Sequence, residues 1–294
     1  MYELIQAGAN TYYLDCPAKV GIYRTDRGVY LIDSGGDKDA GRRIRKLLDQ
    51  QGWPLLGILN THSHADHVGG NQYLQSQTGC KVFAHGIEGA FTAHPILEGV
   101  SLYGGYPCKD LRHKFLLAQE SQVSPFTDPD FPPELEVIPL PGHSFDMVGF
   151  RTPDNVVFLA DCVASRATLE KYAISFLWDV DAFLETLERV ASMEAALFVP
   201  SHAEASPDVR ELVEVNRAKT EEIAARLLAL CRTPASFQQI LQQLFQGYGL
   251  TMNFQQHALV GSTVRSYLSW LRDAGRLDVS FEDCILLWRT VSDQ

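Results

Sequence analysis

The chain has 294 residues and a mass of 32.8 kDa, enough for one large domain or for one large and one small domain. Hydrophobic residues make up 46% of it and charged residues 21%, which is typical of a globular protein and excludes a disordered or collagen-like chain. The formal net charge of −11 argues against a tight, sequence-independent grip on nucleic acid, because such binding normally requires a surplus of basic residues.

The cysteines and the apolar segments indicate the compartment. Six cysteines are scattered without paired spacing in a chain long enough to fold without disulfides, so free thiols in a reducing compartment are expected. The sequence does not start with a basic segment followed by an apolar one, and it has no apolar run of about 18 residues or more. We therefore expect a cytoplasmic protein with no membrane span.

From the start to about residue 205, short β-branched or aromatic runs alternate with amphipathic stretches, which is typical of layered α and β elements. A hairpin is predicted over residues 19–33, and a surface helix follows over 37–51. A second hairpin is expected over 147–161. Further buried strands with polar or histidine-bearing tips are predicted over residues 55–62, 81–85, 135–140 and 196–202.

Two segments depart from this alternation. Residues 86–133 form a long insertion rich in turn-forming residues, with only patches of helical pattern, as in a lid or a binding element. After residue 205 the pattern is helical and ends in a strand pair predicted to turn at Phe281 to Asp283. This tail resembles a winged-helix unit. We therefore expect a main α/β domain over 1–205 and a small, mostly α-helical, winged-helix-like domain over 206–294.

A dense group of potential metal ligands follows the buried strand at 55–62, where the sequence reads HSHADH from residue 62. Histidines two apart in an extended tip point the same way, so His62 and His64 can reach one ion. Asp66 and His67 lie one step further on, where a helix should begin, and face a second ion. Imidazole nitrogen and carboxylate oxygen are ligands that zinc accepts.

Three further candidate ligands each follow a predicted strand: His143, Asp161 and His202. The ends of four strands are expected to meet at one edge, so seven potential ligands should converge on one site. A histidine pair alone is weak evidence. This combination of residue type, order and placement, however, indicates a dinuclear metal site.

The order HxHxDH, His, Asp and His resembles that of the metallo-β-lactamase superfamily over about residues 10–205. The resemblance implies an α/β fold, an αββα sandwich of two mixed β-sheets flanked by helices, with the active site at one edge. It implies two ligand groups joined by a bridging Asp161, with a metal-bound hydroxide between the ions. The first group is His62, His64 and His143, and the second is Asp66, His67 and His202.

Departures from particular branches of the superfamily narrow the function. Asp161 stands where the best-known lactam-hydrolysing zinc enzymes carry a cysteine, and His64 stands where flavodiiron proteins carry a glutamate. We expect a zinc-dependent hydrolase with two Zn²⁺ ions per chain, in which an activated bridging water attacks a small ester, thioester or lactone. Iron or manganese can also occupy such sites. Asp66 is the expected catalytic residue, because it can orient or deprotonate that water.

Two alternatives stay open. The first is a metal-dependent (ribo)nuclease whose winged-helix-like tail guides a strand, although the candidate recognition helix offers only Arg265 and Arg272. The second is a non-catalytic interaction protein whose metals only stabilise the fold.

Substrate contacts are expected from the insertion. Lys109 and Arg112 are candidates to contact an anionic substrate, and Tyr106 is a candidate to line the mouth of the pocket. The expected partner is a small molecule, with neither nucleic acid nor membrane. The uncharged stretch over 233–264 suits a self-associating surface, which leaves a homodimer open.

Overall fold

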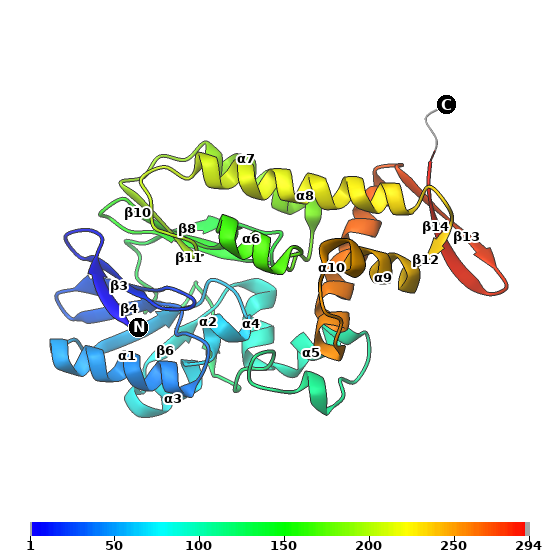
Figure 1. Cartoon of the computed structure of the whole chain (residues 1–294). Coiled ribbons are helices and arrows are strands. Elements are labelled where there is room, and N and C mark those ends of the chain that lie inside the picture. The colour runs from blue at the N-terminus through cyan, green and yellow to red at the C-terminus, as the bar shows by residue number, and fades with distance from the viewer. Residues whose placement is uncertain (1, 292–294) are drawn as a thin grey trace.

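The computed structural model describes residues 2–291 and contains two mixed β-sheets packed face to face (Figure 1). The larger sheet keeps the order of the chain: β1 (Glu3–Gln6), β2 (Thr11–Asp15), β3 (Val20–Thr25), β4 (Gly28–Ile32), β5 (Leu55–Leu59), β6 (Lys81–Phe83) and β7 (Val123–Ser124). The smaller sheet has the order β11-β10-β9-β8, from β8 (Glu136–Pro139), β9 (Val148–Arg151), β10 (Val156–Ala164) and β11 (Leu197–His202). Strands β4 to β7 run parallel, as do β10 and β11, whereas the remaining pairs of both sheets are antiparallel.

The inner faces of the two sheets form one apolar cluster. Leu59 and Phe83 of the larger sheet pack there with Phe150 and Phe158 of the smaller one. Each strand places every second side chain on this face, so the runs that the sequence analysis assigned as buried strands supply the core. This arrangement confirms the expected sandwich.

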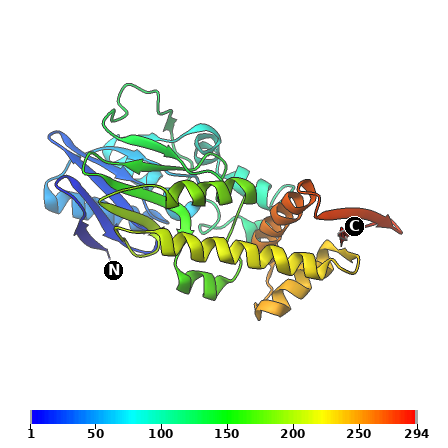
Figure 2. The ribbon, with the colours of Figure 1, turned by 90° about the horizontal axis from the view of Figure 1, so that it is seen from above.

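Helices cover both outer faces (Figures 1 and 2). On the larger sheet, α1 (Lys38–Gln51) buries Ile44 and Leu48, and α3 (Asn71–Thr78) buries Leu74. Asp37 caps the start of α1 by accepting a hydrogen bond from the backbone of Ala40. On the smaller sheet lie α7 (Val180–Ala191) and the long α8 (Arg210–Leu230).

The insertion is more ordered than its sequence pattern predicted. It contains α4 (Gly86–Ala93), α5 (Ile96–Tyr103), the single 3₁₀ turn η1 (Lys109–Leu111) and strand β7. These elements are short and bury few side chains each, so they leave no clear periodicity in the sequence. Strands β1 and β2, at the start of the chain, were also not predicted.

The C-terminal region is helical, as expected. Helix α8 is followed by α9 (Phe237–Tyr248) and α10 (Phe254–Asp273), with a small sheet in the order β12-β14-β13. Its strands are β12 (Ala235–Ser236), β13 (Leu277–Glu282) and β14 (Ile285–Thr290). The hairpin turns at Asp283 and Cys284, slightly later than predicted, because Glu282 still pairs with Ile285. Both turn residues have positive φ, as a two-residue hairpin turn requires.

The cysteines and the helices bear on the expected compartment and on the expected absence of a membrane span. All six cysteines lie within the described residues and are free thiols. Over residues 2–291, no helix combines the length and the apolar character needed to cross a membrane.

Candidate metal centre

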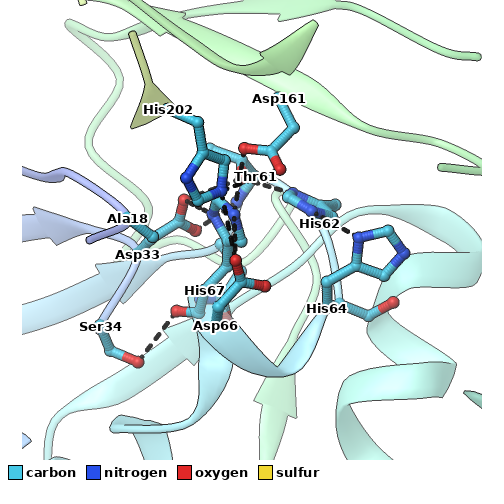
Figure 3. Close-up of polar contacts among 12 residues, drawn as sticks. Ala18, Asp33, Ser34, Thr61, His62, His64, Asp66, His67, Asp161 and His202 are labelled. Carbon is cyan, nitrogen blue, oxygen red and sulfur yellow. Dashed lines mark hydrogen bonds and ion pairs between the residues drawn. The ribbon is translucent and has the colours of Figure 1, made fainter. Parts of the chain in front are cut away.

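The candidate ligands converge at one edge of the sandwich, where several strands end (Figure 3). They form two groups, and within each group the ligand atoms lie within 4.8 Å of one another. The first group is His62, His64 and His143, and the second is Asp66, His67, Asp161 and His202. Asp66 and His67 belong to the four-residue helix α2 (Ala65–Val68), which begins directly after His64. All seven residues singled out from the sequence are therefore brought together.

In the first group, three ring nitrogens meet. Nδ1 of His64 lies 3.0 Å from Nε2 of His62 and 3.0 Å from Nε2 of His143. His62 is fully buried, and the other two rings are nearly so. Burial lowers the pKa of His64 and of His143 to about 4, because a charged ring would lose its hydration. These imidazoles are therefore neutral at pH 7 and offer lone pairs to a cation.

The second group is built around Asp161 of β10. Its Oδ1 lies 3.1 Å from Nε2 of His67, and its Oδ2 lies 3.2 Å from Nε2 of His202. The same Oδ2 lies 3.6 Å from Nε2 of His143, so Asp161 stands at the boundary between the two groups. The side chain of Asp66 is half exposed, and its Oδ2 lies 3.2 Å from Nε2 of His202.

Charge favours a cation in this second group. Asp161 raises the pKa of His202 to about 10, and this effect outweighs desolvation. Desolvation disfavours the charged form of Asp66, yet His67 and a hydrogen bond from His202 lower its pKa well below the usual range. The carboxylates of Asp66 and Asp161 thus stay ionised and stabilise positive charge at the Nε2 atoms. A divalent cation bound to these atoms would bring positive charge to the same place.

The remaining ring nitrogens have partners that fix the tautomers of His67 and His202. Nδ1 of His67 donates to Oδ2 of Asp33 at 2.8 Å, and Nδ1 of His202 donates to the carbonyl of Pro17 at 2.9 Å. With one proton held at Nδ1, a bound cation would displace the proton at Nε2 and take its lone pair.

Asp33 also fixes the tautomer of His62. The single hydroxyl proton of Thr61 is donated to Asp33 Oδ2 at 2.8 Å, so Thr61 Oγ1 accepts from Nδ1 of His62 at 3.0 Å. Asp33 is buried, and its Oδ1 accepts from the backbone of Thr61. The sequence analysis missed this residue, although it follows strand β4 in the way that the predicted ligands follow theirs.

The donor set fits divalent metal ions. Among the described residues, Nε2 of His67 and Oδ1 of Asp161 are buried and make no hydrogen bond, although they face each other. Buried polar atoms are almost always satisfied, so this facing pair indicates a place for a cation. His62, His64 and His143 would hold one ion, and Asp66, His67, Asp161 and His202 a second.

Glu88 of α4 is a second residue that the sequence analysis missed. It is 1% exposed, and its Oε2 accepts from both the backbone and the hydroxyl of Ser63, which stands between His62 and His64. Its Oε1 accepts from the hydroxyl of Ser144, the neighbour of His143. No motif in the sequence signals this role, because Glu88 lies in the insertion, where the sequence shows no clear pattern.

The predicted substrate contacts lie elsewhere. Arg112 donates to the hydroxyl of Tyr106 at 3.0 Å and stacks on its ring, and Tyr106 is 72% exposed. Lys109 begins η1 in the same segment. None of the three is among the described residues that line the two cavities bordering the cluster.

Fold and site together define a class of protein: an αββα sandwich with a histidine and aspartate metal-ligand cluster at one edge. The family model described as the metallo-beta-lactamase superfamily matches residues 13–202. The chain therefore belongs to the metallo-beta-lactamase superfamily, as the HxHxDH pattern indicated.

Curated relatives share parts of the chain. A hydroxyacylglutathione hydrolase of Methylococcus capsulatus is 42% identical over 64 residues, which is 19% of this chain and 25% of that enzyme. The match therefore spans only a quarter of that relative's length. The probable metallo-hydrolase YqgX of Bacillus subtilis is 27% identical over 196 residues, covering 66% of this chain and 81% of the relative.

Two solved structures resemble nearly the whole chain in fold. A beta-lactamase domain protein from Burkholderia ambifaria has a TM-score of 0.74 at 18% identity, covering 98% of this chain and 94% of that protein. A metallo-beta-lactamase family protein from Thermus thermophilus has a TM-score of 0.72 at 18% identity, covering 96% of this chain and 99% of that protein. The likeness in fold thus includes the C-terminal region.

Proposed function

We propose that this protein is a cytoplasmic, zinc-dependent hydrolase that binds two Zn²⁺ ions per chain and cleaves a small ester, thioester or lactone. The observation that carries the proposal is the pair of adjacent ligand groups with Asp161 at their boundary. When bound, two divalent cations lower the pKa of a water molecule and polarise a carbonyl oxygen. Membership of the superfamily and the partial likeness to hydroxyacylglutathione hydrolases support hydrolysis at a carbonyl carbon.

Asp66 is the residue we assign to the attacking water. Its half-exposed carboxylate borders a cavity of about 270 Å³ together with His202 and Phe115. The pKa of Asp66 lies below its usual range, so the group stays ionised at neutral pH and is a poor store for a proton. We therefore assign Asp66 the role of binding and orienting the water by accepting its hydrogen bonds, rather than the role of general base.

The test is the initial rate of thioester hydrolysis by zinc-loaded protein, with glutathione and N-acetylcysteamine thioesters as substrates. We expect Asp66→Ala to lower kcat by about two orders of magnitude or more, because a group that orients the nucleophile is lost. Circular dichroism and Tm should show a folded variant. Asp49→Ala, on the exposed face of α1, is the matched control and should retain the wild-type rate.

Elemental analysis of the same preparation should give two zinc ions per chain. Equal rates for the wild type and Asp66→Ala on every thioester would contradict the proposed hydrolysis. A single zinc ion per chain at saturation would contradict the dinuclear site.

A further inference from the structure

A cavity of about 230 Å³ opens beside the metal centre, and Asp66 is not among the residues that line it. The ligands His143, Asp161 and His202 form part of its wall. The rest of the wall comes from β10, from α6 (Arg166–Tyr172) and the segment after it, and from α10 of the C-terminal region. Figure 1 shows α10 between the sandwich and the terminal hairpin.

The wall of this cavity is mainly apolar. Val163, Ile174, Phe176, Leu259 and Val260 contribute to it. Among the described residues that line it, no lysine or arginine is present, and the metal ligands are the only titratable groups besides the phenol of one tyrosine. Apart from the ligand cluster itself, the wall offers no cationic side chain to an anionic group, whereas an apolar group would be removed from water.

The apolar wall directly adjoins the first ligand group. The ring centroid of Phe176 lies 5.1 Å from that of His64 and 5.8 Å from that of His143, both edge to face. The segment that carries Phe176 is tied to α10, because the backbone of Leu177 donates to the hydroxyl of Thr263. The apolar wall and the ligand cluster are therefore parts of one cavity.

We infer that this cavity is the acyl pocket of the enzyme, and that its occupant is an uncharged, apolar acyl group of about six to eight carbon atoms. The size follows from the volume, since an apolar cavity of about 150 Å³ holds benzene and this one is larger. The inference rests on the proposed function, and it makes α10 a determinant of substrate choice. It also replaces the anionic substrate expected from Lys109 and Arg112 with a neutral one.

The test uses alkyl hydroxamates, whose head group chelates divalent metal ions, bound to zinc-loaded protein and measured by calorimetry. We expect hexanohydroxamate to bind at least about tenfold more tightly than acetohydroxamate, because each buried methylene contributes up to about fourfold. Succinate monohydroxamate should bind more weakly than butyrohydroxamate, since its carboxylate enters an apolar wall that also carries Asp161.

Variants of α10 locate the effect. Leu259→Trp fills the cavity and should reduce the hexano-to-aceto affinity ratio to near one, whereas Leu259→Ala enlarges it and should shift the optimum to longer chains. Ser269→Trp, on an exposed position of the same helix, is the matched control and should keep the wild-type ratio. An affinity independent of chain length in the wild type, or an unchanged ratio in both Leu259 variants, would overturn the assignment.

The same panel separates the two proposals. If the hydroxamates obey the predicted order but no acyl thioester is hydrolysed, the apolar pocket stands and the proposed hydrolysis fails. If acetyl, hexanoyl and succinyl thioesters are hydrolysed equally well by the wild type and by Leu259→Trp, the hydrolysis stands and the acyl pocket is overturned.

Discussion

Glu88 illustrates how a single buried residue can organise the metal centre without binding a metal. Its carboxylate accepts hydrogen bonds from Ser63 and Ser144 and from the backbone of Asp146. The two loops that carry the histidines of the first group are thus tied to one side chain of α4. Partners of this kind hold metal ligands in position and affect the affinity for the metal.

We expect Glu88→Gln to weaken this arrangement. The amide nitrogen would face donors that now bond to a carboxylate oxygen, so the free energy of unfolding should fall by about 1–3 kcal/mol. Zinc affinity should fall by about tenfold. Urea denaturation and competition with a chromogenic chelator measure the two quantities. Glu221→Gln, exposed on α8, should change neither, and a Glu88→Gln protein that matches it in both would contradict the role.

At the scale of elements, α9 forms within a stretch that has no charged side chain over residues 233–264. Its ends explain how it does so. Ser236 and Gln239 form a capping box at the start, and Gly249 ends the helix in the left-handed conformation, with φ at 65°. Its apolar face, which includes Leu241 and Leu244, is buried in the core shared with α8 and α10.

Removal of the cap gives a prediction for this element. Ser236→Ala leaves the backbone donor of Gln239 without its side-chain acceptor, so the free energy of unfolding should fall by about 1 kcal/mol. Guanidinium denaturation measures the change. Ser269→Ala, on an exposed face in the interior of α10, should alter stability by no more than about 0.5 kcal/mol. An equally small effect at Ser236 would show that the cap does not stabilise α9.

At the scale of the whole molecule, one apolar core joins the sandwich to the C-terminal region. Leu159 of the smaller sheet, Leu187 of α7 and Leu227 of α8 belong to the same buried cluster as Leu244 of α9 and Leu268 of α10. The boundary predicted near residue 206 falls just before α8, which runs from the sandwich to the base of the C-terminal hairpin (Figure 2). A shared core couples the stability of the two parts.

We therefore expect a single cooperative unfolding transition. Leu244→Ala, at a fully buried position, should lower the free energy of unfolding by about 2–5 kcal/mol in both parts of the chain. Hydrogen exchange followed by mass spectrometry across a denaturant series reports peptides from β5 and from α9 separately. Coincident midpoints, shifted together by the substitution, are the expected result. Two separate midpoints would instead favour independently folding domains over 1–205 and 206–294.

The sequence by itself determined the family, the sandwich and the seven candidate ligands. HSHADH places four of these side chains within six consecutive residues, so the structure of one strand end and one helix start suffices to bring them together. His143, Asp161 and His202 could be added because each follows an apolar run that reads as a buried strand. Such signals are local, so they can be recognised without knowledge of the remaining fold.

Only the tertiary structure decided what surrounds those ligands. Glu88 and Leu259 lie far from most of the ligands in sequence and reach the site through the packing of α4 and α10. Lys109 and Arg112 had the charge expected of a substrate contact, but neither is among the described residues that line the cavities at the cluster. The physical reason is that a side chain's neighbours across the fold depend on long-range packing of whole elements, which leaves no fixed spacing in the chain.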